Sequence, residues 1–361
     1  IAIVAGTRPE AIKLLPVIEA LKKDGNFSLH FIATGQHRAL FDQAMKSGGP
    51  SPDIDLGLMQ ADQPVGEFLA RAAGALREAI AALDPGLVIV QGDTTTAYAG
   101  ALAAYRLGCP LAHVEAGLRT ASIDSPFPEE LFRRAISRLS TLHFAPTELA
   151  RDMLVHEGVA RSAVHVTGNT GIDHLFQVMA RPRLTNTATR LLKITGGGPF
   201  ALATVHRREN RGAGMSALAR GFAQVAQGCG LPIILPRHPA PGLQSLEDML
   251  SEQEHIHVIP PLDPDSFVQL LARAALAMTD SGGVQEEAVT LGTPVVVLRD
   301  ETERSEAVTA GRALLAGNDP GAMLRTARIM LDQGRFPPST IFGDGAAGIR
   351  IAHIIKSWFD R

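Results

Sequence analysis

The stretch DSGGVQEEAVTLGTPVVVLRDETERSE, residues 280–306, follows the apolar run 275–278 and joins a buried strand to a helix through a glycine turn. Gly282 and Gly283 allow the backbone to turn sharply and to approach a ligand closely. The segment after them is expected to be helical. The unpaired N–H groups at the start of that helix, together with the Ser281 hydroxyl, would bind an anion such as a diphosphate.

Charged side chains around this turn narrow the kind of ligand. Phosphate repels carboxylates, so Glu287 is better suited to a ribose diol, while Arg304 could supply a compensating positive charge. A simpler interpretation is an ordinary glycine-rich turn with solvated glutamates. The stretch therefore indicates one half of a site for a phosphorylated ligand, and other loops must supply the second half.

Length and composition favour a two-domain globular protein. The 361 residues are 45% hydrophobic, enough for two cores, because single cores rarely grow beyond ~250–300 residues. The net charge is −3 and the basic residues form no runs, so we expect no nucleic-acid partner. No apolar stretch approaches ~18 residues and no signal segment is apparent, so we expect a cytoplasmic protein without membrane association. Cys109 and Cys229 are isolated, which argues against a disulfide framework or a zinc cluster.

Short apolar runs alternate with segments of helical period, a pattern typical of parallel sheets covered by helices. In the first half, apolar runs lie at 1–5, 29–33, 87–90, 111–114 and 143–145, and helical segments at 9–23 and 94–107. In the second half, apolar runs lie at 200–205, 232–235, 256–259, 276–278 and 295–298, and helical segments at 215–227 and 265–274. The predicted fold class is α/β, with two Rossmann-like, doubly wound parallel-sheet domains facing a cleft.

The polar, glycine-containing segment 168–198 is typical of a hinge and linker. We therefore predict an N-terminal domain of residues 1–168, completed by a C-terminal helix at 346–361, and a C-terminal domain of residues 169–345. Ligands of open parallel sheets bind beyond the carboxyl ends of the strands. The loops after the strands of both domains should therefore line the cleft.

Three loops in the first half carry charged side chains. In GTRPEAIK, Arg8 and Lys13 could bind an anion, or they could be solvated cations on a capped helix. Asp93 in QGDTTT and Glu115 in HVEAGLRT each follow a strand, and Glu129 comes next in SPFPEE. Carboxylates collected in a partly desolvated cleft can act as acid and base. Asp93 alone could equally be a helix cap.

The second half begins with a strand that runs into ATVHRRENR, which places His206 at the end of the strand. A histidine there could protonate or bind a leaving phosphate oxygen, or it could be structural, with Arg207 and Arg208 bracing the domain interface. GAGMSA at 212–217 fits a loose dinucleotide pattern, but it does not directly follow a strand, and no acidic strand end comes ~20 residues later. We therefore expect no nicotinamide site.

The chain resembles the non-hydrolysing UDP-N-acetylglucosamine 2-epimerases over nearly its whole length, through the motifs GTRPEAIK, TGQHR, GDTTT, VEAGLRT, PFPEE, HRREN, SGGVQEEA, LGTPVVVLR and TERSEAV. That family shares the two-Rossmann-domain architecture of the GT-B glycosyltransferases. The resemblance implies a homodimeric isomerase that interconverts UDP-GlcNAc and UDP-ManNAc, a precursor of bacterial surface polysaccharides, without a redox cofactor or metal. The implied mechanism eliminates UDP to a bound 2-acetamidoglucal and then adds UDP back.

The resemblance also implies roles for individual residues. Asp93, Glu115 and Glu129 would be the acid/base carboxylates, and His206 would lie near the diphosphate. The implied substrate contacts are Arg8, Lys13, Arg133, Ser281, Gly282 and Gly283, with Phe267 at the uracil, Glu287 at the ribose and Arg304 holding the substrate across the cleft. A second, activating UDP-GlcNAc is implied at Gln36, His37, Gln43 and Gln63.

Several positions depart from the family pattern, namely Pro64, Phe132, Ala240, Val289 and Ser305. Phe132 could reshape the sugar pocket beside Glu129, or it could be a packing exchange on a helix. The alternatives to the epimerase are a hydrolysing 2-epimerase releasing UDP and a free ManNAc-type sugar, an epimerase of a different UDP-sugar, a GT-B glycosyltransferase and a catalytically silent UDP-sugar sensor. The sequence leaves the natural sugar and the pathway open.

Overall fold

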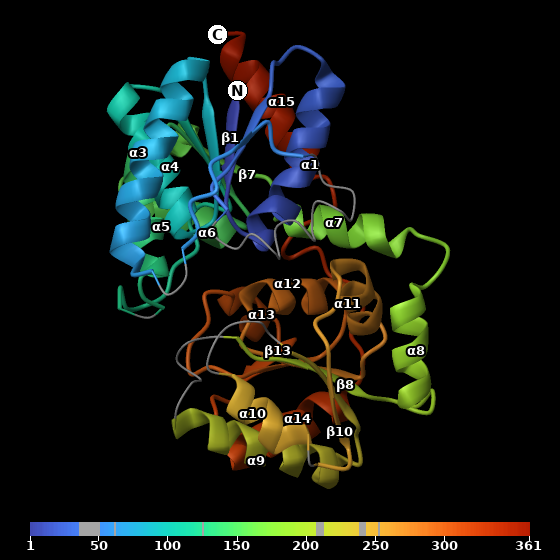
Figure 1. Cartoon of the computed structure of the whole chain (residues 1–361). Coiled ribbons are helices and arrows are strands. Elements are labelled where there is room, and N and C mark those ends of the chain that lie inside the picture. The colour runs from blue at the N-terminus through green and yellow to red at the C-terminus, as the bar shows by residue number, and fades with distance from the viewer. Residues whose placement is uncertain (36–50, 61–62, 125, 207–212, 238–242, 252) are drawn as a thin grey trace. The chain divides into compact units, whose positions relative to one another are not determined.

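The chain folds into two units, each a parallel sheet with helices on both faces (Figure 1). The structure is a computed structural model, and it describes residues 1–35, 51–60, 63–124, 126–206, 213–237, 243–251 and 253–361. Unit 1 comprises Ile1–Phe176 and Phe342–Arg361, and unit 2 comprises Gln177–Ile341. The predicted α/β class with two doubly wound parallel sheets is confirmed. The domain limits at 168/169 and 345/346 stay predictions.

Unit 1 contains seven strands within the described residues, and all of their pairings are parallel. They are β1 (Ala2–Ala5), β2 (His30–Ala33), β3 (Ile54–Asp55), β4 (Val88–Gln91), β5 (Leu111–Val114), β6 (Leu142–Ala145) and β7 (Val164–Val166). Their order in the sheet is β3-β2-β1-β4-β5-β6-β7. Successive strands are therefore added on one side of β1 up to β3 and on its other side from β4 onward. Parallel sheets bind ligands at this switch point between β1 and β4.

The helices of unit 1 cover both faces of its sheet. They are α1 (Arg8–Asp24), α3 (Val65–Leu83), α4 (Thr95–Leu107), α5 (Glu129–Leu139), α6 (Glu148–His156), the short 3₁₀ helix η1 (Arg161–Ala163), the start of α7 (Thr170–Met179), and α15 (Ala347–Phe359). Side chains alternate along β1, as the period of a strand requires. Ile3 and Ala5 pack with α1 and α15, whereas Ala2 and Val4 pack with α3 and α4.

Local sequence signals set the ends of α1. Thr7 accepts a hydrogen bond from the Glu10 backbone, and the Glu10 side chain accepts one from the Thr7 backbone, which together form a capping box. Gly25 ends the helix with φ of 76°, a conformation that glycine adopts without steric cost. α15 packs against α1 so closely that a Cβ on Gly348 would lie 2.6 Å from the Pro16 carbonyl.

Unit 2 repeats the same design with six strands in the described residues. They are β8 (Ala201–Thr204), β9 (Ile233–Pro236), β10 (Ile256–Ile259), β11 (Leu276–Thr279), β12 (Val295–Val297) and β13 (Ala313–Leu315). The order is β10-β9-β8-β11-β12-β13, again all parallel, so the switch point lies between β8 and β11. The helices are α8 (Asn186–Ile194), α9 (Ala213–Cys229), α10 (Gln244–Ser251), α11 (Pro264–Leu271), α12 (Gly282–Leu291), α13 (Ser305–Thr309) and α14 (Pro320–Gln333).

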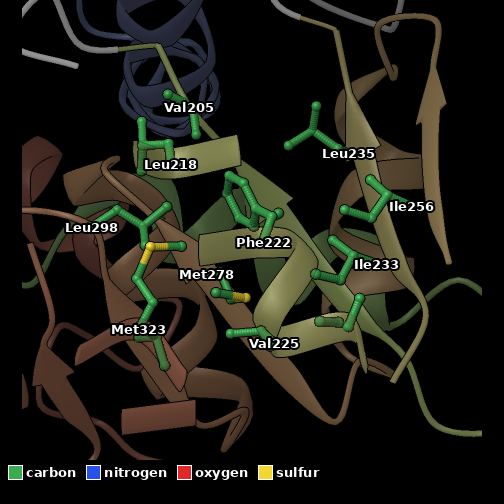
Figure 2. Packing of buried hydrophobic residues seen from close by; sticks show 14 of the residues in the cluster. Val205, Leu218, Phe222, Val225, Ile233, Leu235, Ile256, Met278, Leu298 and Met323 are labelled. Atoms are coloured by element: carbon green, nitrogen blue, oxygen red, sulfur yellow. The ribbon is translucent and has the colours of Figure 1, made fainter. Parts of the chain in front are cut away.

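The main core of unit 2 lies between its sheet and the helices α9, α10 and α14. Figure 2 shows Phe222 and Val225 of α9 directed toward Ile233 of β9 and Met278 of β11, all fully buried. Met323 of α14 closes the same core. On the other face of this sheet, Figure 1 shows α11 and α12. Because α12 begins at Gly282, shortly after β11 ends at Thr279, its N-terminus lies beside the carboxyl end of that strand.

The segment 168–198 differs from the irregular linker that its composition suggested, because it contains α7 and α8. Thr185 caps α8 by accepting a hydrogen bond from the Ala188 backbone at 3.0 Å. Ala188 and Leu191 are buried, and α8 packs against α11. A cap and one apolar face thus make a helix from a polar stretch.

No helix in the described parts of either unit combines the length and apolar character needed to cross a membrane.

Candidate active site

Charged side chains gather in unit 1 at the carboxyl ends of three neighbouring strands, β1, β4 and β5. Gln91 ends β4 and pairs in register with Val114, the last residue of β5. Glu115 comes next, with φ of 66° in the left-handed region, which costs a residue other than glycine about 1–3 kcal/mol. Its carboxylate accepts hydrogen bonds from Lys13 Nζ and Gln91 Nε2, each at 2.5 Å. A strained backbone therefore presents a carboxylate that one cation and one amide hold in place.

Lys13 lies on α1, one turn after the helix begins, and its side chain is 15% exposed. Its ammonium group forms the ion pair with Glu115, which is 8% exposed. Arg8, the first residue of α1, is half-buried at the same end of the helix. Lys13 therefore helps to hold the Glu115 carboxylate in place. Contacts of Lys13 and Arg8 with a diphosphate stay predictions.

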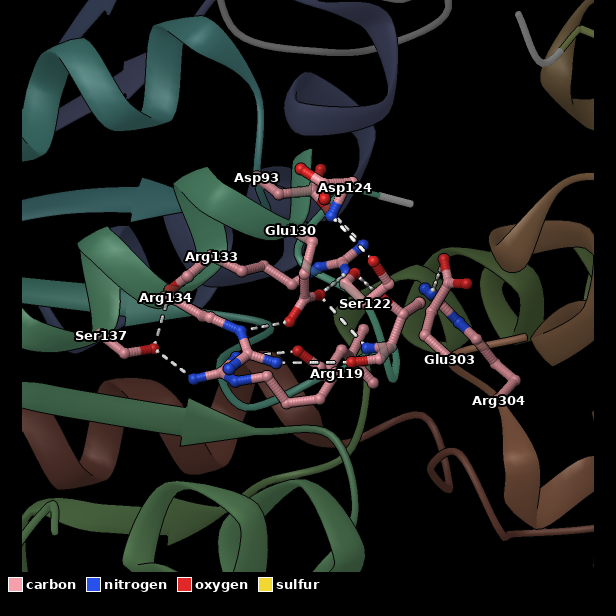
Figure 3. A network of polar contacts seen from close by, with 12 residues as sticks. Asp93, Arg119, Ser122, Asp124, Glu130, Arg133, Arg134, Ser137, Glu303 and Arg304 are labelled. Carbon is pink, nitrogen blue, oxygen red and sulfur yellow. Dashed lines mark hydrogen bonds and ion pairs between the residues drawn. The ribbon is translucent and has the colours of Figure 1, made fainter. Parts of the chain in front are cut away.

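Asp93 follows β4 and is held by a buried arginine from α5. Arg133 Nη2 lies 2.5 Å from Asp93 Oδ2, and Arg133 Nη1 lies 2.7 Å from Glu130 Oε2 (Figure 3). Arg133 is 2% exposed and Glu130 is fully buried, whereas Asp93 is 27% exposed. The family resemblance implies a substrate contact for Arg133, which stays a prediction. In the structure its guanidinium bridges two carboxylates of unit 1.

Glu129 begins α5 immediately before the buried Glu130. It is half-buried and lies in the first turn of the helix. Its neighbour Glu130 contacts Arg133, which connects this end of α5 to Asp93. The role of Glu129 in proton transfer stays a prediction.

Glu10 joins the loops that follow β1 and β4. Its carboxylate accepts hydrogen bonds from the Thr94 hydroxyl at 2.5 Å, from the Thr7 hydroxyl at 2.7 Å and from the backbone N–H groups of Gly6 and Thr7. Burial raises the pKa of the Glu10 carboxyl, although the hydrogen bonds from Thr94 and Thr7 oppose this shift. Glu10 therefore fixes the position of Thr94, the residue directly after Asp93.

In unit 2, the first turn of α12 has the geometry expected of an anion site. Ser281 is the N-cap residue, and its side chain makes no capping hydrogen bond to the described residues. A Cβ on Gly283 would meet no heavy atom within 4 Å. The Gly283 position of this turn therefore faces open space, and the first N–H groups of a helix can bind an anion such as a diphosphate.

Gly282 and Arg304 are packed together under the same turn. A Cβ on Gly282 would lie 2.6 Å from Cζ of Arg304. Arg304 Nε lies 2.8 Å from Glu286 Oε1, and Arg304 Nη1 lies 2.6 Å from Glu303 Oε1. All three charged side chains are at most 5% exposed. The absence of a side chain at Gly282 thus makes room for a guanidinium whose charge two buried carboxylates balance.

His206 follows β8 and is oriented by the first residue after β11. His206 Nδ1 lies 2.9 Å from Asp280 Oδ1, and the His206 backbone N–H donates to the same carboxylate. Asp280 is fully buried, whereas the His206 side chain is 31% exposed. The Asp280 contact makes Nδ1 a donor nitrogen, and Nε2 is on the other side of the ring.

The remaining predicted contacts lie in both units or outside the described residues. Phe267 is half-buried on α11, and Glu287 is half-buried on α12. Gln63 of the predicted activator site is hydrogen-bonded to Arg71 and to the Met59 sulfur. Gln36, His37, Gln43, Arg207, Arg208 and Ala240 lie outside the described residues.

Of the departures from the family pattern that the structure describes, Phe132 and Val289 are buried, whereas Pro64, the N-cap residue of α3, and Ser305 are exposed. Phe132 is 4% exposed and stacks on Tyr98 of α4, with ring centroids 4.9 Å apart. This contact supports the interpretation of Phe132 as a packing exchange between α4 and α5. Val289 is fully buried, and Ser305 is the first residue of α13.

Sequence reasoning assigned no separate role to three polar residues that complete these clusters: Gln91, Glu130, which it noted only as the neighbour of Glu129 in SPFPEE, and Asp280. Gln91 and Asp280 stand at strand ends next to a switch point, so the parallel register with a neighbouring strand could have revealed them. Glu130 carried no separate signal, because nothing in the pair of adjacent glutamates shows which one is buried.

Comparisons with known proteins identify extended similarity. The sequence model of the family described as UDP-N-acetylglucosamine 2-epimerase matches residues 19–356. A probable UDP-N-acetylglucosamine 2-epimerase of Ralstonia solanacearum is 39% identical over 371 residues, covering 99% of each chain. The UDP-N-acetylglucosamine 2-epimerase of Escherichia coli strain K12 is 39% identical over 366 residues, covering 98% of this chain and 97% of its own.

Solved structures agree with these matches. The UDP-GlcNAc 2-epimerase of Neisseria meningitidis bound to UDP-GlcNAc has a TM-score of 0.91 and 34% identity, covering 100% of this chain and 99% of its own. The Methanocaldococcus jannaschii enzyme in complex with UDP-GlcNAc and UDP has a TM-score of 0.89 and 34% identity, covering 99% of each chain.

Proposed function

Since the chain belongs to the UDP-N-acetylglucosamine 2-epimerase family and is an isomerase, we propose that it interconverts UDP-GlcNAc and UDP-ManNAc. One observation of the structure carries this proposal. Asp93 and Glu115 lie at the ends of adjacent strands, and a different cation holds each of them. Inversion at one carbon requires groups that handle a proton on either face of the sugar, and two separately held carboxylates meet that requirement.

The chemistry proceeds by elimination, because the C2 proton is not next to a carbonyl and is barely acidic. A carboxylate takes the C2 proton, the C–H electron pair becomes the C1=C2 double bond, and UDP leaves with the electrons of the C1–O bond. In the return step a carboxyl group delivers a proton to the other face of C2, and the UDP oxygen attacks C1. Asp93, Glu115 and Glu129 share these acid and base roles.

The leaving group needs stabilisation that unit 2 can supply. The N–H groups of the α12 first turn, with Ser281 and Gly283, bind the diphosphate. The Asp280 carboxylate orients the ring of His206, which contacts the departing oxygen. Glu287 binds the ribose and Phe267 contacts the uracil. Closure of the two units about the hinge expected at residues 168–198 would keep water from the glycal.

Three further parts of the proposal rest on family membership alone. We place the protein in the cytoplasm as a homodimer, and we keep an activating UDP-GlcNAc at the site that includes Gln63. Light scattering after gel filtration gives the mass of the assembly. Single-chain particles at all assay concentrations would contradict the homodimer.

Incubation with UDP-GlcNAc in D₂O tests the reaction, with products followed by NMR and mass spectrometry. We expect UDP-ManNAc carrying one deuterium at C2. Free ManNAc with stoichiometric UDP would identify a hydrolysing enzyme, and unchanged substrate would point to another UDP-sugar.

Two variants test the carboxylates. We expect Glu115→Gln and Asp93→Asn to bind UDP normally while losing most turnover, because the groups that move the proton are gone. Unchanged turnover in either purified variant would contradict the assigned roles.

A further inference from the structure

Glu130 is a fully buried carboxylate that makes three polar contacts in unit 1. It accepts hydrogen bonds from Arg133 Nη1 at 2.7 Å, from Arg134 Nε at 2.8 Å and from the Thr120 backbone N–H at 3.2 Å. A buried carboxylate requires such compensation, because removing it from water is costly. The three contacts connect Glu130 with different residues around the candidate active site: Arg133, Arg134 and Thr120.

The contact with Arg133 leads to Asp93. Arg133 is 2% exposed and lies between the two carboxylates, 2.5 Å from Asp93 and 2.7 Å from Glu130 (Figure 3). The contact with Thr120 leads to Glu115, since both residues belong to the loop that follows β5. Glu130 is thus connected to two of the carboxylates proposed to move protons and adjoins the third, Glu129, in sequence.

We infer that Glu130 is a positioning residue of the proposed reaction, which fixes the orientation of Arg133 and shares its positive charge, so that Asp93 stays in place and retains its capacity to exchange a proton. The inference rests on the proposed function. With Glu130 ionised, the Arg133 charge is divided between two carboxylates. Without that charge, Arg133 would be paired with Asp93 alone, and the attraction between these two groups would be stronger.

The helix explains why two adjacent glutamates perform different tasks. Successive residues of a helix point about 100° apart, so Glu129 and Glu130 cannot face the same surroundings. Arg133 and Arg134 follow Glu130 by three and four residues, the spacings at which helical side chains meet. Glu130 therefore forms both ion pairs within α5, while Glu129 stays partly exposed.

Other charged and titratable groups surround this cluster, and they leave the argument intact. Lys13 and Glu115 form their own ion pair, and Glu10 is held by hydroxyl and backbone donors. Burial lowers the pKa of His113, on β5, to about 4, so this imidazole is neutral above pH 6. Arg119 and Arg134 lie on the far side of Glu130 from Asp93 (Figure 3), and Glu157 pairs with both arginines.

The test compares three variants by the pH dependence of kcat. Glu130→Gln keeps the shape of the side chain and removes its charge. One limb of the plot of kcat against pH is set by the protonation of Asp93. We expect this limb to move to lower pH by about one unit, whether Asp93 acts as base or as acid. We expect kcat to fall roughly tenfold while KM changes less than twofold, since the misplaced group does not set ground-state binding.

Arg134→Gln provides a change of the opposite sign. Arg134 is 39% exposed, so the variant should fold normally. Removing this cation leaves Glu130 to Arg133 alone, and the same limb should move to higher pH. Glu148→Gln is the matched control, because Glu148 is 66% exposed and pairs with Arg151, with no contact to Glu130, Arg133 or Arg134 among the described contacts. It should leave the limb in place.

A second readout separates this inference from the proposed function. In protein labelled with ¹³C at aspartate carboxyls, the Asp93 signal, assigned with Asp93→Asn, can be titrated without substrate. Opposite movements of its midpoint in Glu130→Gln and Arg134→Gln would support the inference even if the unchanged protein did not epimerise UDP-GlcNAc. A midpoint unmoved in both folded variants would overturn it, whatever the substrate. If Glu130→Gln does not fold, the Arg134→Gln midpoint alone decides.

Discussion

The contact between His206 and Asp280 shows how a buried residue controls a reactive neighbour. Asp280 accepts from the His206 ring and from its backbone N–H, so both the position and the tautomer of the imidazole are fixed. The sequence identified the histidine because it follows a strand. Its partner lies 74 positions later and meets it only because β8 and β11 are neighbours in the sheet.

Asp280→Asn tests this orientation. The amide can still accept from the His206 backbone, but its NH₂ group favours the wrong ring tautomer, so we expect turnover to fall by about 10²–10⁴-fold, as such changes do in other histidine–aspartate pairs. UDP affinity should change little. Asp319→Asn is the control, since Asp319 caps α14 and asparagine caps helices equally well. Equal turnover in the two variants would show that Asp280 does not contribute to the reaction.

A single helix, α12, illustrates how two adjacent glycines have different reasons to be glycine. The Gly282 position is filled by the Arg304 guanidinium, which Glu286 and Glu303 keep from moving aside. The Gly283 position faces open space. The first glycine therefore serves internal packing, and the second serves the approach of a ligand.

Paired alanine substitutions separate these two reasons. Gly282→Ala should displace Arg304 and lower the free energy of unfolding by about 1–3 kcal/mol, the usual cost of overpacking. Gly283→Ala should leave stability unchanged, yet weaken UDP binding, because its methyl group would occupy the space proposed for the diphosphate. Urea unfolding and calorimetric titration with UDP measure both effects. Normal UDP affinity in Gly283→Ala would argue against the diphosphate site.

Two neighbouring strands of unit 1, β5 and β6, each carry a buried histidine whose pKa is lowered. His113 on β5 and His143 on β6 are opposite each other in register. Burial lowers their pKa values to about 4 and about 3, respectively. Both are therefore neutral in the folded protein at pH 5, whereas in the unfolded chain they would take up protons below about pH 6.5.

This difference predicts acid sensitivity. The unfolded state binds more protons than the folded state as pH falls from 6.5, so stability is lost in that direction and stops falling below pH 3. From pH 7 to pH 5 the two histidines together should lower the free energy of unfolding by about 3–4 kcal/mol. His143→Leu should halve this dependence, and His156→Gln, at an exposed position, should not change it. An undiminished slope in His143→Leu would contradict the assignment.

The two units of the molecule differ in whether they are formed from one chain segment or from two. Unit 2 is one continuous segment, whereas unit 1 needs residues from both ends of the chain. The last helix completes the core of unit 1, where Ile351 and Ile355 are fully buried with residues of α1 and β1. The Asp173 carboxylate also accepts hydrogen bonds from the first turn of α15.

Gly348→Ala tests this closure of unit 1. The added methyl group would collide with the Pro16 backbone, so we expect unit 1 to be destabilised by about 1–3 kcal/mol or more. Gly74→Ala is the matched helical control, because nothing lies within 4 Å of its Cβ, and it should stabilise α3 by about 0.5–1 kcal/mol. Limited proteolysis should then release fragments of unit 1 first. Preferential cleavage of unit 2 would contradict the prediction.

Much of this architecture could be read from local patterns. The runs at 111–114 and 256–259 coincide with β5 and β10, and the C-terminal segment begins within one residue of α15. Elements without a strong apolar period were not predicted, such as the short β3 and the helix α8, whose cap and two buried residues lie in a polar stretch. Their stability comes from contacts with neighbouring elements, which a local pattern does not contain.

The sequence by itself determined the two parallel sheets, the loops that carry Asp93, Glu115, His206 and the α12 turn, and the family. These features depend on periodicity, turn residues and motifs, all of which are local along the chain. The tertiary structure alone decided which charges meet: Lys13 with Glu115, Arg133 with Asp93 and Glu130, and Asp280 with His206. Most of these partners are far apart in sequence, and a carboxylate acquires its chemistry from the charges and the burial that folding brings to it.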